Sequence, residues 1–374
     1  MDRVLTFPLY VGGFLGPFGG AMLVALIPNV ADDLGTSLAW VAAAITAYMV
    51  PFAALQLVSG TVAERLGPRR VVRTAYVAFG AAALACAFAP EIWSFLGARA
   101  LMGGANAFLS PILLAALAEV VAPEILGRSV GTFAAAQTAG LTLAPVLGGA
   151  LGEISWRLAF VLVAVVAAVL AFPRQSLRAV EHRPEPGASA RALLNRWISL
   201  LGTTALLGYL GFTAIGFVLA LVADEEFGLG SAGRGLLVAG YGVGGIAFGR
   251  YAGTVVDRLG RPGTAFFGAL GCTAGVLGLY VAPTVWSLAF VYFLVGCASA
   301  FVWAGLNTIV VESFAANRAG ATSAYSAFKF AGVAIAPLVY VPLFDADTRL
   351  PFLLAAAFSA LVAALVLPWF SRYR

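Results

Sequence analysis

The stretch GTVAERLGPRR at residues 60–70 decides the fold, because the chain repeats it in a shorter form, GTVVDRLGR, at residues 253–261. The two copies begin 193 residues apart (253 minus 60). The same offset relates APEIWS at 89–94 to APTVWS at 282–287. The repetition predicts two related halves with equivalent turns.

Long apolar runs flank both copies and make up most of the 374 residues. Hydrophobic residues account for 61% of the chain and charged residues for 10%, with a mean hydropathy of +0.96. Soluble proteins are roughly half apolar and a quarter charged. Runs of about 17 to 27 residues are long enough to cross a bilayer core as helices, and the alternating ten-residue segments of a transmembrane barrel are absent. We predict an all-α membrane protein with twelve transmembrane helices in two six-helix pseudo-symmetric bundles, at about 5–28, 38–58, 71–89, 92–118, 129–151, 157–173, 197–221, 233–253, 264–282, 286–310, 321–343 and 351–370.

Basic residues are concentrated in alternate connectors. With both termini placed in the cytoplasm, 17 of the 22 Lys and Arg residues lie on the cytoplasmic side, and only Arg157, Arg234 and Arg349 lie in the opposite connectors. Cytoplasmic loops of membrane proteins carry such an excess. We therefore attribute the net charge of +5 to the orientation of the chain in the membrane and not to a nucleic-acid partner. The expected location is the cell (inner) membrane.

The longest polar stretch, residues 174–196, divides the chain into its halves. It predicts a cytoplasmic linker between an N-terminal six-helix bundle (1–173) and a C-terminal one (197–374). Two such bundles related by an axis along the membrane normal are typical of one architecture of secondary transporters, whose substrate site lies near the midplane. We interpret the apolar N-terminus as a first span and not as a cleaved signal.

Residues that carry enzyme or cofactor chemistry are scarce. Cys86, Cys272 and Cys297 lie in separate apolar runs and His182 is the only histidine, so zinc, haem and iron–sulfur sites lack a ligand set. A GxxxxGK[ST] phosphate loop is absent, which excludes a P-loop ATPase within this chain. We expect no cofactor, no metal and no enzymatic activity. The expected partners are the lipid bilayer, a small-molecule substrate and protons as coupling ion, with the chain acting as a monomer.

Three motifs make nearly the whole chain resemble the major facilitator superfamily. Residues 60–70 look like its loop signature GxxaDRxGrr, with Glu64 where the family usually has Asp, and RALMGGA at 99–105 resembles its RxxxGxga motif. Residues 131–149 are similar to the GxxxxxxxxGxxxGPxxGG motif of its drug:proton antiporters, with Ala144 in place of a Gly. The resemblance implies a secondary active transporter that exports small amphipathic or hydrophobic molecules by alternating access, coupled to protons.

The loop signature and its second copy are predicted to form a gate. Gly67 permits a tight turn, and Glu64 and Asp257 can pair with arginines or with the positive end of a helix. Such a cluster can hold the inner ends of helices together in one transport state. A purely topological role is the alternative for the arginines. The candidate gate residues are Gly60, Glu64, Arg65, Gly67, Arg69, Arg70, Asp257 and Arg258.

Two prolines lie at equivalent positions of the fifth and eleventh spans. A proline within a helix removes a backbone donor and can bend the helix, while small neighbours allow close packing. Ordinary small-residue packing is the alternative interpretation. The candidate helix-bend residues are Gly140, Pro145, Gly148, Gly149 and Pro337.

Arg99 and Lys329 are ionisable residues within spans, where charge is costly and usually faces a cavity or a partner. Snorkelling to the interface is the alternative. The resemblance favours Arg99, because the family motif places there an arginine thought to serve proton transfer. Lys329 corresponds to Gln137 in the repeat. The candidate residues of the substrate and proton pathway are Arg99, Asn106, Gln137, Lys329, Tyr48, Tyr241, Trp303 and Asn307.

No acidic residue lies deep within a span, although a proton-coupled antiporter normally needs one. Either burial raises the pKa of Glu119 or Glu312, or the substrate itself carries the proton. Two cations without a deep acid predict a preference for anionic or neutral solutes. A facilitator or importer of a metabolite, favoured by the missing acid, is the alternative transporter, and a receptor or a membrane enzyme is the alternative from another class.

Overall fold

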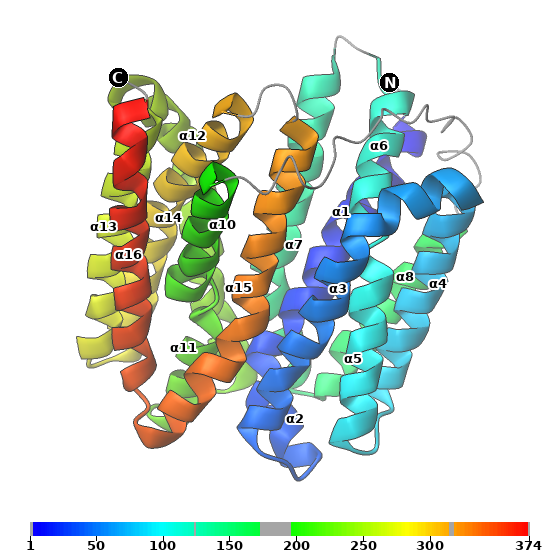
Figure 1. Cartoon of the computed structure of the whole chain (residues 1–374). Coiled ribbons are helices and arrows are strands. Elements are labelled where there is room, and N and C mark those ends of the chain that lie inside the picture. The colour runs from blue at the N-terminus through cyan, green and yellow to red at the C-terminus, as the bar shows by residue number, and fades with distance from the viewer. Residues whose placement is uncertain (1–2, 123–124, 173–195, 314–317, 373–374) are drawn as a thin grey trace. The chain divides into compact units, whose positions relative to one another are not determined.

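A computed structural model describes residues 3–122, 125–172, 196–313 and 318–372. Within these ranges all regular structure is helical (Figure 1), as predicted. The chain divides into two compact units, one of Met1–Glu185 with Gly230–Gly235 and one of Pro186–Leu229 with Leu236–Arg374. Of the predicted linker, 174–196, only Arg196 lies within the described residues.

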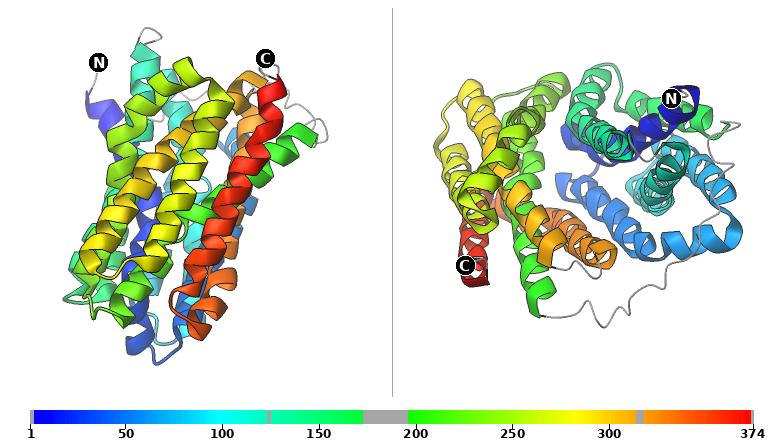
Figure 2. Two further views of the ribbon diagram at one scale, coloured as in Figure 1. Left: turned by 90° about the vertical axis from the view of Figure 1, so that its left-hand side faces the viewer. Right: turned by 90° about the horizontal axis from the view of Figure 1, so that it is seen from above.

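The first unit contains the first six predicted spans. Three consecutive elements form the first span, and two helices form the fourth. The elements are α1 (Arg3–Ala21), η1 (Met22–Leu26), α2 (Ile27–Asp33), α3 (Leu38–Leu66), α4 (Pro68–Ala87), α5 (Ile92–Asn106), α6 (Ser110–Val120), α7 (Leu126–Gly152) and α8 (Trp156–Leu170). Seen from above, α3 and α4 run in different directions from their turn (Figure 2, right).

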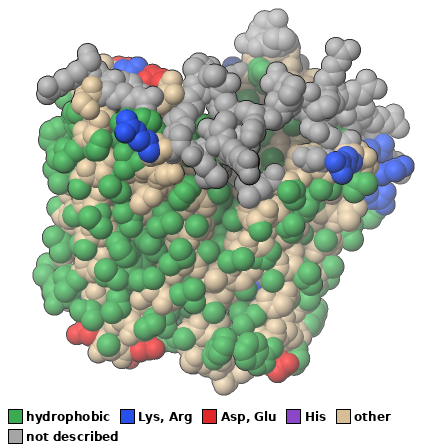
Figure 3. Space-filling view, viewed as in Figure 1, with side chains coloured by type: hydrophobic (Ala, Val, Ile, Leu, Met, Phe, Trp, Pro, Cys, Tyr) green, Lys and Arg blue, Asp and Glu red, His purple; other side chains and the backbone are tan. Residues whose placement is uncertain are grey.

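The second unit contains the other six spans, except for the start of α12, which the first unit includes. The seventh span consists of three elements. The elements are α10 (Arg196–Gly208), η3 (Tyr209–Thr213), α11 (Gly216–Glu225), α12 (Ser231–Leu259), α13 (Arg261–Val281), α14 (Val285–Ser313), α15 (Arg318–Ala346) and α16 (Leu350–Arg372). Hydrophobic side chains cover most of the flank of each unit that faces the viewer in Figure 3.

Ten helical segments are long and apolar enough to cross a membrane on their own. The remaining two are α8, which has 15 residues, and α12, whose GYGVGG stretch at 240–245 lowers its mean hydropathy. Together they give the twelve helical spans that the sequence predicts, within the described part of the chain.

The repeated charged stretches each turn at a glycine. Gly67, between α3 and α4, has a φ of 86°, and Gly260, between α12 and α13, has a φ of 75°. Side chains rarely permit a positive φ, because the Cβ atom clashes with the backbone. One glycine therefore suffices to join two long helices in each unit.

The internal repeat is also visible in helix packing. A Cβ atom built at Gly103 of α5 would lie 1.9 Å from the carbonyl oxygen of Tyr48 on α3. One built at Gly296 of α14 would lie 2.1 Å from the carbonyl oxygen of Tyr241 on α12. Both pairs are related by the sequence offset of 193 (296 minus 103, 241 minus 48). Each unit therefore contains the same close crossing of two backbones, which only glycine allows.

Three spans are interrupted near their middle. α1 passes into the 3-10 helix η1 after Ala21, α5 ends at Asn106 before α6 begins, and α10 passes into the π-helix η3 at Tyr209. Interruptions change which backbone groups are paired, and π segments are frequent at functional sites. The side-chain clusters described below contact these interruptions.

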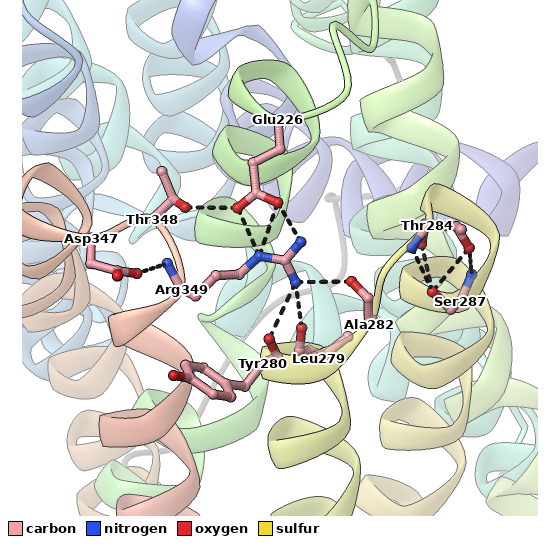
Figure 4. A network of polar contacts seen from close by, with 9 residues as sticks. All are labelled: Glu226, Leu279, Tyr280, Ala282, Thr284, Ser287, Asp347, Thr348 and Arg349. Atoms are coloured by element: carbon pink, nitrogen blue, oxygen red, sulfur yellow. Dashed lines mark hydrogen bonds and ion pairs between the residues drawn. The ribbon is translucent and has the colours of Figure 1, made fainter.

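Arg349, between α15 and α16, connects three loops at one end of the second unit (Figure 4). Its Nε donates to both carboxylate oxygens of Glu226, at 2.7 and 3.0 Å, and its Nη1 donates to the carbonyl oxygens of Leu279 (2.9 Å) and Ala282 (3.1 Å) at the end of α13. The Thr348 hydroxyl donates to the same carboxylate at 2.7 Å. The guanidinium holds the pKa of Glu226 below its usual value.

Candidate functional site

The side chain of Arg99, on α5, is completely buried within the first unit. Its Nη1 donates to the carbonyl oxygen of Gly19 at 2.9 Å, and its Nη2 donates to that of Gly20 at 3.2 Å. The guanidinium carbon lies 4.5 Å from the centre of the Tyr48 ring on α3. One side chain of α5 thus contacts both α1 and α3.

The two carbonyl groups that accept from Arg99 lie at the end of α1, next to η1. Where α-helical pairing changes to 3-10 pairing, carbonyl groups can lose their regular partners. A guanidinium presents several N–H groups in a fixed fork and can bond two of them at once. No ion pair joins Arg99 to an acidic residue among those described. The geometry therefore suits stabilisation of the first span, and the pathway role of Arg99 stays a prediction.

The other pathway candidates of the first unit lie on α3, α5 and α7. The hydroxyl of Tyr48 donates to the carbonyl oxygen of Gly16 at 3.3 Å. Asn106 is 4% exposed, and its Oδ1 has no hydrogen-bond partner among the described residues. Gln137 donates to Ser110 at the start of α6 at 3.3 Å. The structure thus brings Tyr48 against α1, whereas Gln137 connects α6 and α7.

Lys329, on α15, lies among polar and aromatic side chains of the second unit. Its Nζ donates to Oδ1 of Asn307 on α14 at 3.2 Å. It lies 4.3 Å from the centre of the Tyr325 ring and 5.1 Å from that of Trp303. No ion pair joins it to an acidic residue within the described ranges. The two aromatic faces attract the cation. The Lys329 side chain is half-buried, so part of its surface stays accessible.

Trp303, on α14, extends this arrangement into a cluster of rings and hydroxyls. Its ring centre lies 5.0 Å from that of Tyr209 and 5.5 Å from that of Phe212. Its Nε1 donates to the hydroxyl of Tyr241 at 3.4 Å, and that hydroxyl lies 2.9 Å from the hydroxyl of Thr213. Tyr209 and Thr213 are the first and last residues of η3, so the break in the seventh span belongs to the cluster.

We call five of these side chains the lysine–aromatic cluster: Lys329, Asn307, Trp303, Tyr325 and Tyr241. Sequence reasoning had singled out four of them, and the structure brings these four together. It missed Tyr325, although that residue lies one helical turn before Lys329, a spacing that places both on one helix face. It also missed Tyr209 and Thr213, because nothing in the sequence signals the π-helix.

The candidate gate residues lie at helix ends, and those with described side chains are exposed. The Glu64 side chain is outside what the structure describes. The exposed residues are Gly60, Arg65, Arg69 and Arg70 around the α3–α4 turn and Asp257 and Arg258 at the end of α12. The latch function of Glu64 and Asp257 stays a prediction.

One ion pair does involve the second copy of the loop signature, through its last residue. Arg261, the first residue of α13, places its Nη2 2.8 Å from Oε1 of Glu312 near the end of α14. Nε of the same guanidinium donates to both carboxylate oxygens, at 3.2 and 3.0 Å. The pair joins two helices within the second unit.

The candidate helix-bend residues are buried within helices that continue through them. α7 passes through Pro145 and α15 passes through Pro337. A Cβ atom at Gly140 would lie 2.4 Å from a backbone oxygen of α1, and one at Gly148 would lie 2.9 Å from a backbone oxygen of η1. Gly149 is buried on the same helix. Gly140 and Gly148 therefore let α7 pack closely on the first span, whereas a Cβ atom at Gly149 would lie 2.2 Å from the carbonyl oxygen of Ser231.

Comparison with known families gives a match over almost the entire chain. The Major Facilitator Superfamily model matches residues 9–203 and 201–374. The chain belongs to the major facilitator superfamily. This confirms the resemblance that the repeated loop signature suggested, and it places the protein in a family of transporters and not of enzymes.

Curated relatives of this superfamily member match over part of its length. It is 34% identical over 157 residues to the multidrug resistance protein B homolog of Mycobacterium tuberculosis, covering 40% of this chain and 29% of that protein. It is 35% identical over 143 residues to the puromycin resistance protein pur8 of Streptomyces alboniger (37% and 28%) and 29% identical over 171 residues to the multidrug efflux pump LfrA of Mycolicibacterium smegmatis (44% and 33%). The matched stretches therefore span about a third or less of these relatives.

A solved structure supports the major facilitator fold. The crystal structure of a D-xylose-proton symporter matches with a TM-score of 0.79, covering 97% of this chain and 96% of that one at 15% identity. At that identity the likeness concerns the fold alone.

Proposed function

We propose that this major facilitator superfamily member exports small amphipathic or hydrophobic molecules by alternating access. Three relatives are named for drug resistance or efflux, and α7 carries the antiporter-like pattern. The observation that carries the proposal is the lysine–aromatic cluster. Ligand sites are mostly apolar with a few placed polar groups, and this cluster offers aromatic faces, an amide, hydroxyls and one ammonium group to a solute with rings and a polar end.

The cluster favours anionic and neutral solutes over lipophilic cations. Lys329 has no acidic partner among the described residues, so a second cation beside it would be repelled strongly at low dielectric. Arg99 does not add to this preference, because its guanidinium is completely buried against carbonyl groups. The preference inferred from two cations in the sequence thus depends on Lys329.

A proton gradient is the energy source that we propose. Glu119 and Glu312 are both exposed at helix ends, and 38% of the Glu312 side chain is accessible. Neither carboxylate lies in the interior of a span, where a proton carrier would have to be placed. This supports the second route, in which the substrate carries the proton and Lys329 binds its anionic form.

The same proposal includes the placement of the protein. We propose that it is a monomer in the cell membrane. Both termini are placed in the cytoplasm, because the basic connectors follow the positive-inside pattern. The functional domains are then an N-terminal bundle (1–173), a cytoplasmic linker (174–196) and a C-terminal bundle (197–374).

Transport by the purified protein in liposomes tests the proposal. We expect accumulation of fluorescein, an anionic probe, under an imposed pH gradient, and slower transport of the cation ethidium. Lys329→Gln should abolish the preference for the anion, whereas Lys329→Arg should retain it. Arg250→Gln, which removes an exposed cation of α12, is the matched control. An unchanged preference in Lys329→Gln would contradict the assignment of the site.

A facilitator or an importer is the second candidate, favoured by the lack of an acid deep within any span. Its test is counterflow in the same liposomes. Counterflow in the wild type without accumulation under any ion gradient would establish facilitated diffusion and overturn the antiporter proposal.

A further inference from the structure

An apolar groove lies between α3, α4 and α5 of the first unit, and of the candidate residues named above only Arg70 lines it. α3 and α4 both pack on α5 but contact each other little, because they diverge from the turn at Gly67 (Figure 2, right). α5 therefore forms the floor of the groove and the other two helices form its walls. Its volume of about 960 Å³ lies at the upper end of the range of ligand pockets, about 300–1,000 Å³.

Small residues create this volume. Gly97 and Gly104 lie on the floor, and Thr74, Ala78 and Ala85 follow one face of α4. A Cβ atom built at Gly97 would meet no atom within 4 Å. At 1.5 Å per residue, the lining from Thr74 to Ala85 extends about 16 Å along the helix. The groove is thus long, and the space above Gly97 on its floor is unfilled.

One charged residue, Arg70, lines the groove close to the α3–α4 turn. The Arg70 side chain is exposed, and it forms no ion pair with an acidic residue among those described. Basic side chains gather at the upper edge over α3 and α4 in Figure 3, above an apolar flank. The groove therefore has one cationic end, at the membrane surface where the basic connectors lie, and an apolar length.

We propose that this groove binds an acyl chain of an anionic phospholipid, such as phosphatidylglycerol, whose phosphate pairs with Arg70. An arginine can bond two phosphate oxygens at once, and the cytoplasmic leaflet, which the basic connectors face, attracts basic segments through its anionic lipids. Apart from Arg70 and Thr74 the lining side chains are apolar. A solute with polar groups along its length would leave them unpaired, whereas an acyl chain has none.

Native mass spectrometry of the full-length protein in neutral detergent tests this site. The probes are dioleoyl phosphatidylglycerol and dioleoyl phosphatidylcholine, added at equal concentration. We expect preferential retention of phosphatidylglycerol. Arg70→Gln should lower that retention about fivefold, the effect of one basic residue near an anionic surface, and leave phosphatidylcholine unchanged. Arg69→Gln, an exposed neighbour outside the groove lining, is the control and should retain the preference.

A second variant tests the acyl-chain part of the groove. Gly97→Leu should fill the floor and lower retention of both lipids, whereas Gly131→Leu, at another helical glycine with no atom within 4 Å, should not. If Gly97→Leu does not fold, Thr74→Leu replaces it. Inorganic phosphate should not displace the lipid, because it lacks the acyl chain. Equal effects of Arg69→Gln and Arg70→Gln, equal effects of Gly97→Leu and Gly131→Leu, or displacement by phosphate or fluorescein would overturn the proposal.

Discussion

Replacing Arg99 with methionine should destabilise the first unit by about 3 kcal/mol. The change removes two charge-assisted hydrogen bonds, of 2.9 and 3.2 Å, each contributing about 1.5 kcal/mol or more. It also removes a cation–π contact of about 1 kcal/mol with Tyr48. The contact of Nε with the carbonyl oxygen of Ala44, at 3.5 Å, adds little. Relief from burying a charge offsets part of the loss.

The three buried free cysteines allow this effect to be measured unit by unit. Cys86 lies on α4 of the first unit, and Cys272 lies on α13 of the second. In single-cysteine variants, a thiol-reactive dye reports the temperature at which each side chain becomes accessible. A loss of 3 kcal/mol corresponds to a shift of roughly 6–12 °C for a unit of this size. We expect that shift at Cys86 and a much smaller one at Cys272.

Two further variants complete the experiment. Arg250→Met, at an exposed position of α12, is the matched control. Arg99→Lys should give an intermediate shift, because an ammonium group lacks the planar fork of a guanidinium. A shift for Arg99→Met no larger than that of the control would refute the stabilising role. Unchanged stability with an altered pH dependence of transport would instead favour the proton-transfer role that the family motif implies.

Three other predictions follow from the geometry. Gly103→Leu should reduce folded yield on gel filtration far more than Gly97→Leu, because its side chain would begin 1.9 Å from the Tyr48 carbonyl oxygen. Arg349 lowers the pKa of Glu226, so their pair stabilises the protein above the unfolded pKa of about 4.3 and is lost as the pH falls through the lower folded value. Glu226→Gln should therefore cost up to about 1 kcal/mol at pH 7, and its difference from wild type should shrink as the pH falls below the unfolded pKa, as followed by thermal unfolding monitored by tryptophan fluorescence. Asp257→Asn should change the labelling rates of single cysteines in the inner vestibule, and unchanged rates would rule out a latch function.

Much of the fold could be predicted because its signals are local. A span is recognised by apolar residues that lie next to one another in the sequence, and a turn such as that at Gly67 by a glycine between two runs. The repeat offset of 193 also relates Gly103 to Gly296, but the structure was needed to show that both lie at the same close helix crossing. The breaks at η1 and η3 had no such signal, because a change in helical pairing depends on neighbours from other spans.

The candidate site divides in the same way. Lys329 and Arg99 stood out because a charge within a span requires a partner, and the sequence alone shows how unusual they are. It could not name the partners of Arg99, because these are backbone carbonyls, which every residue carries. Trp303, Asn307 and Tyr241 were identified as polar or aromatic residues of the spans, but nothing local distinguished a residue in a cluster from one in an interfacial belt.

The sequence by itself determined the twelve spans, the glycine turns and the distribution of charge between connectors, which follow from residues within one stretch, and the two related halves, which follow from comparing one stretch with another. Only the tertiary structure decided that Arg99 bonds the end of α1, that Lys329 lies between the rings of Tyr325 and Trp303, and that α3 and α4 diverge enough to leave a groove on α5. The physical reason is that such contacts join residues up to 80 positions apart. Their geometry depends on how closely small residues let each pair of helices approach.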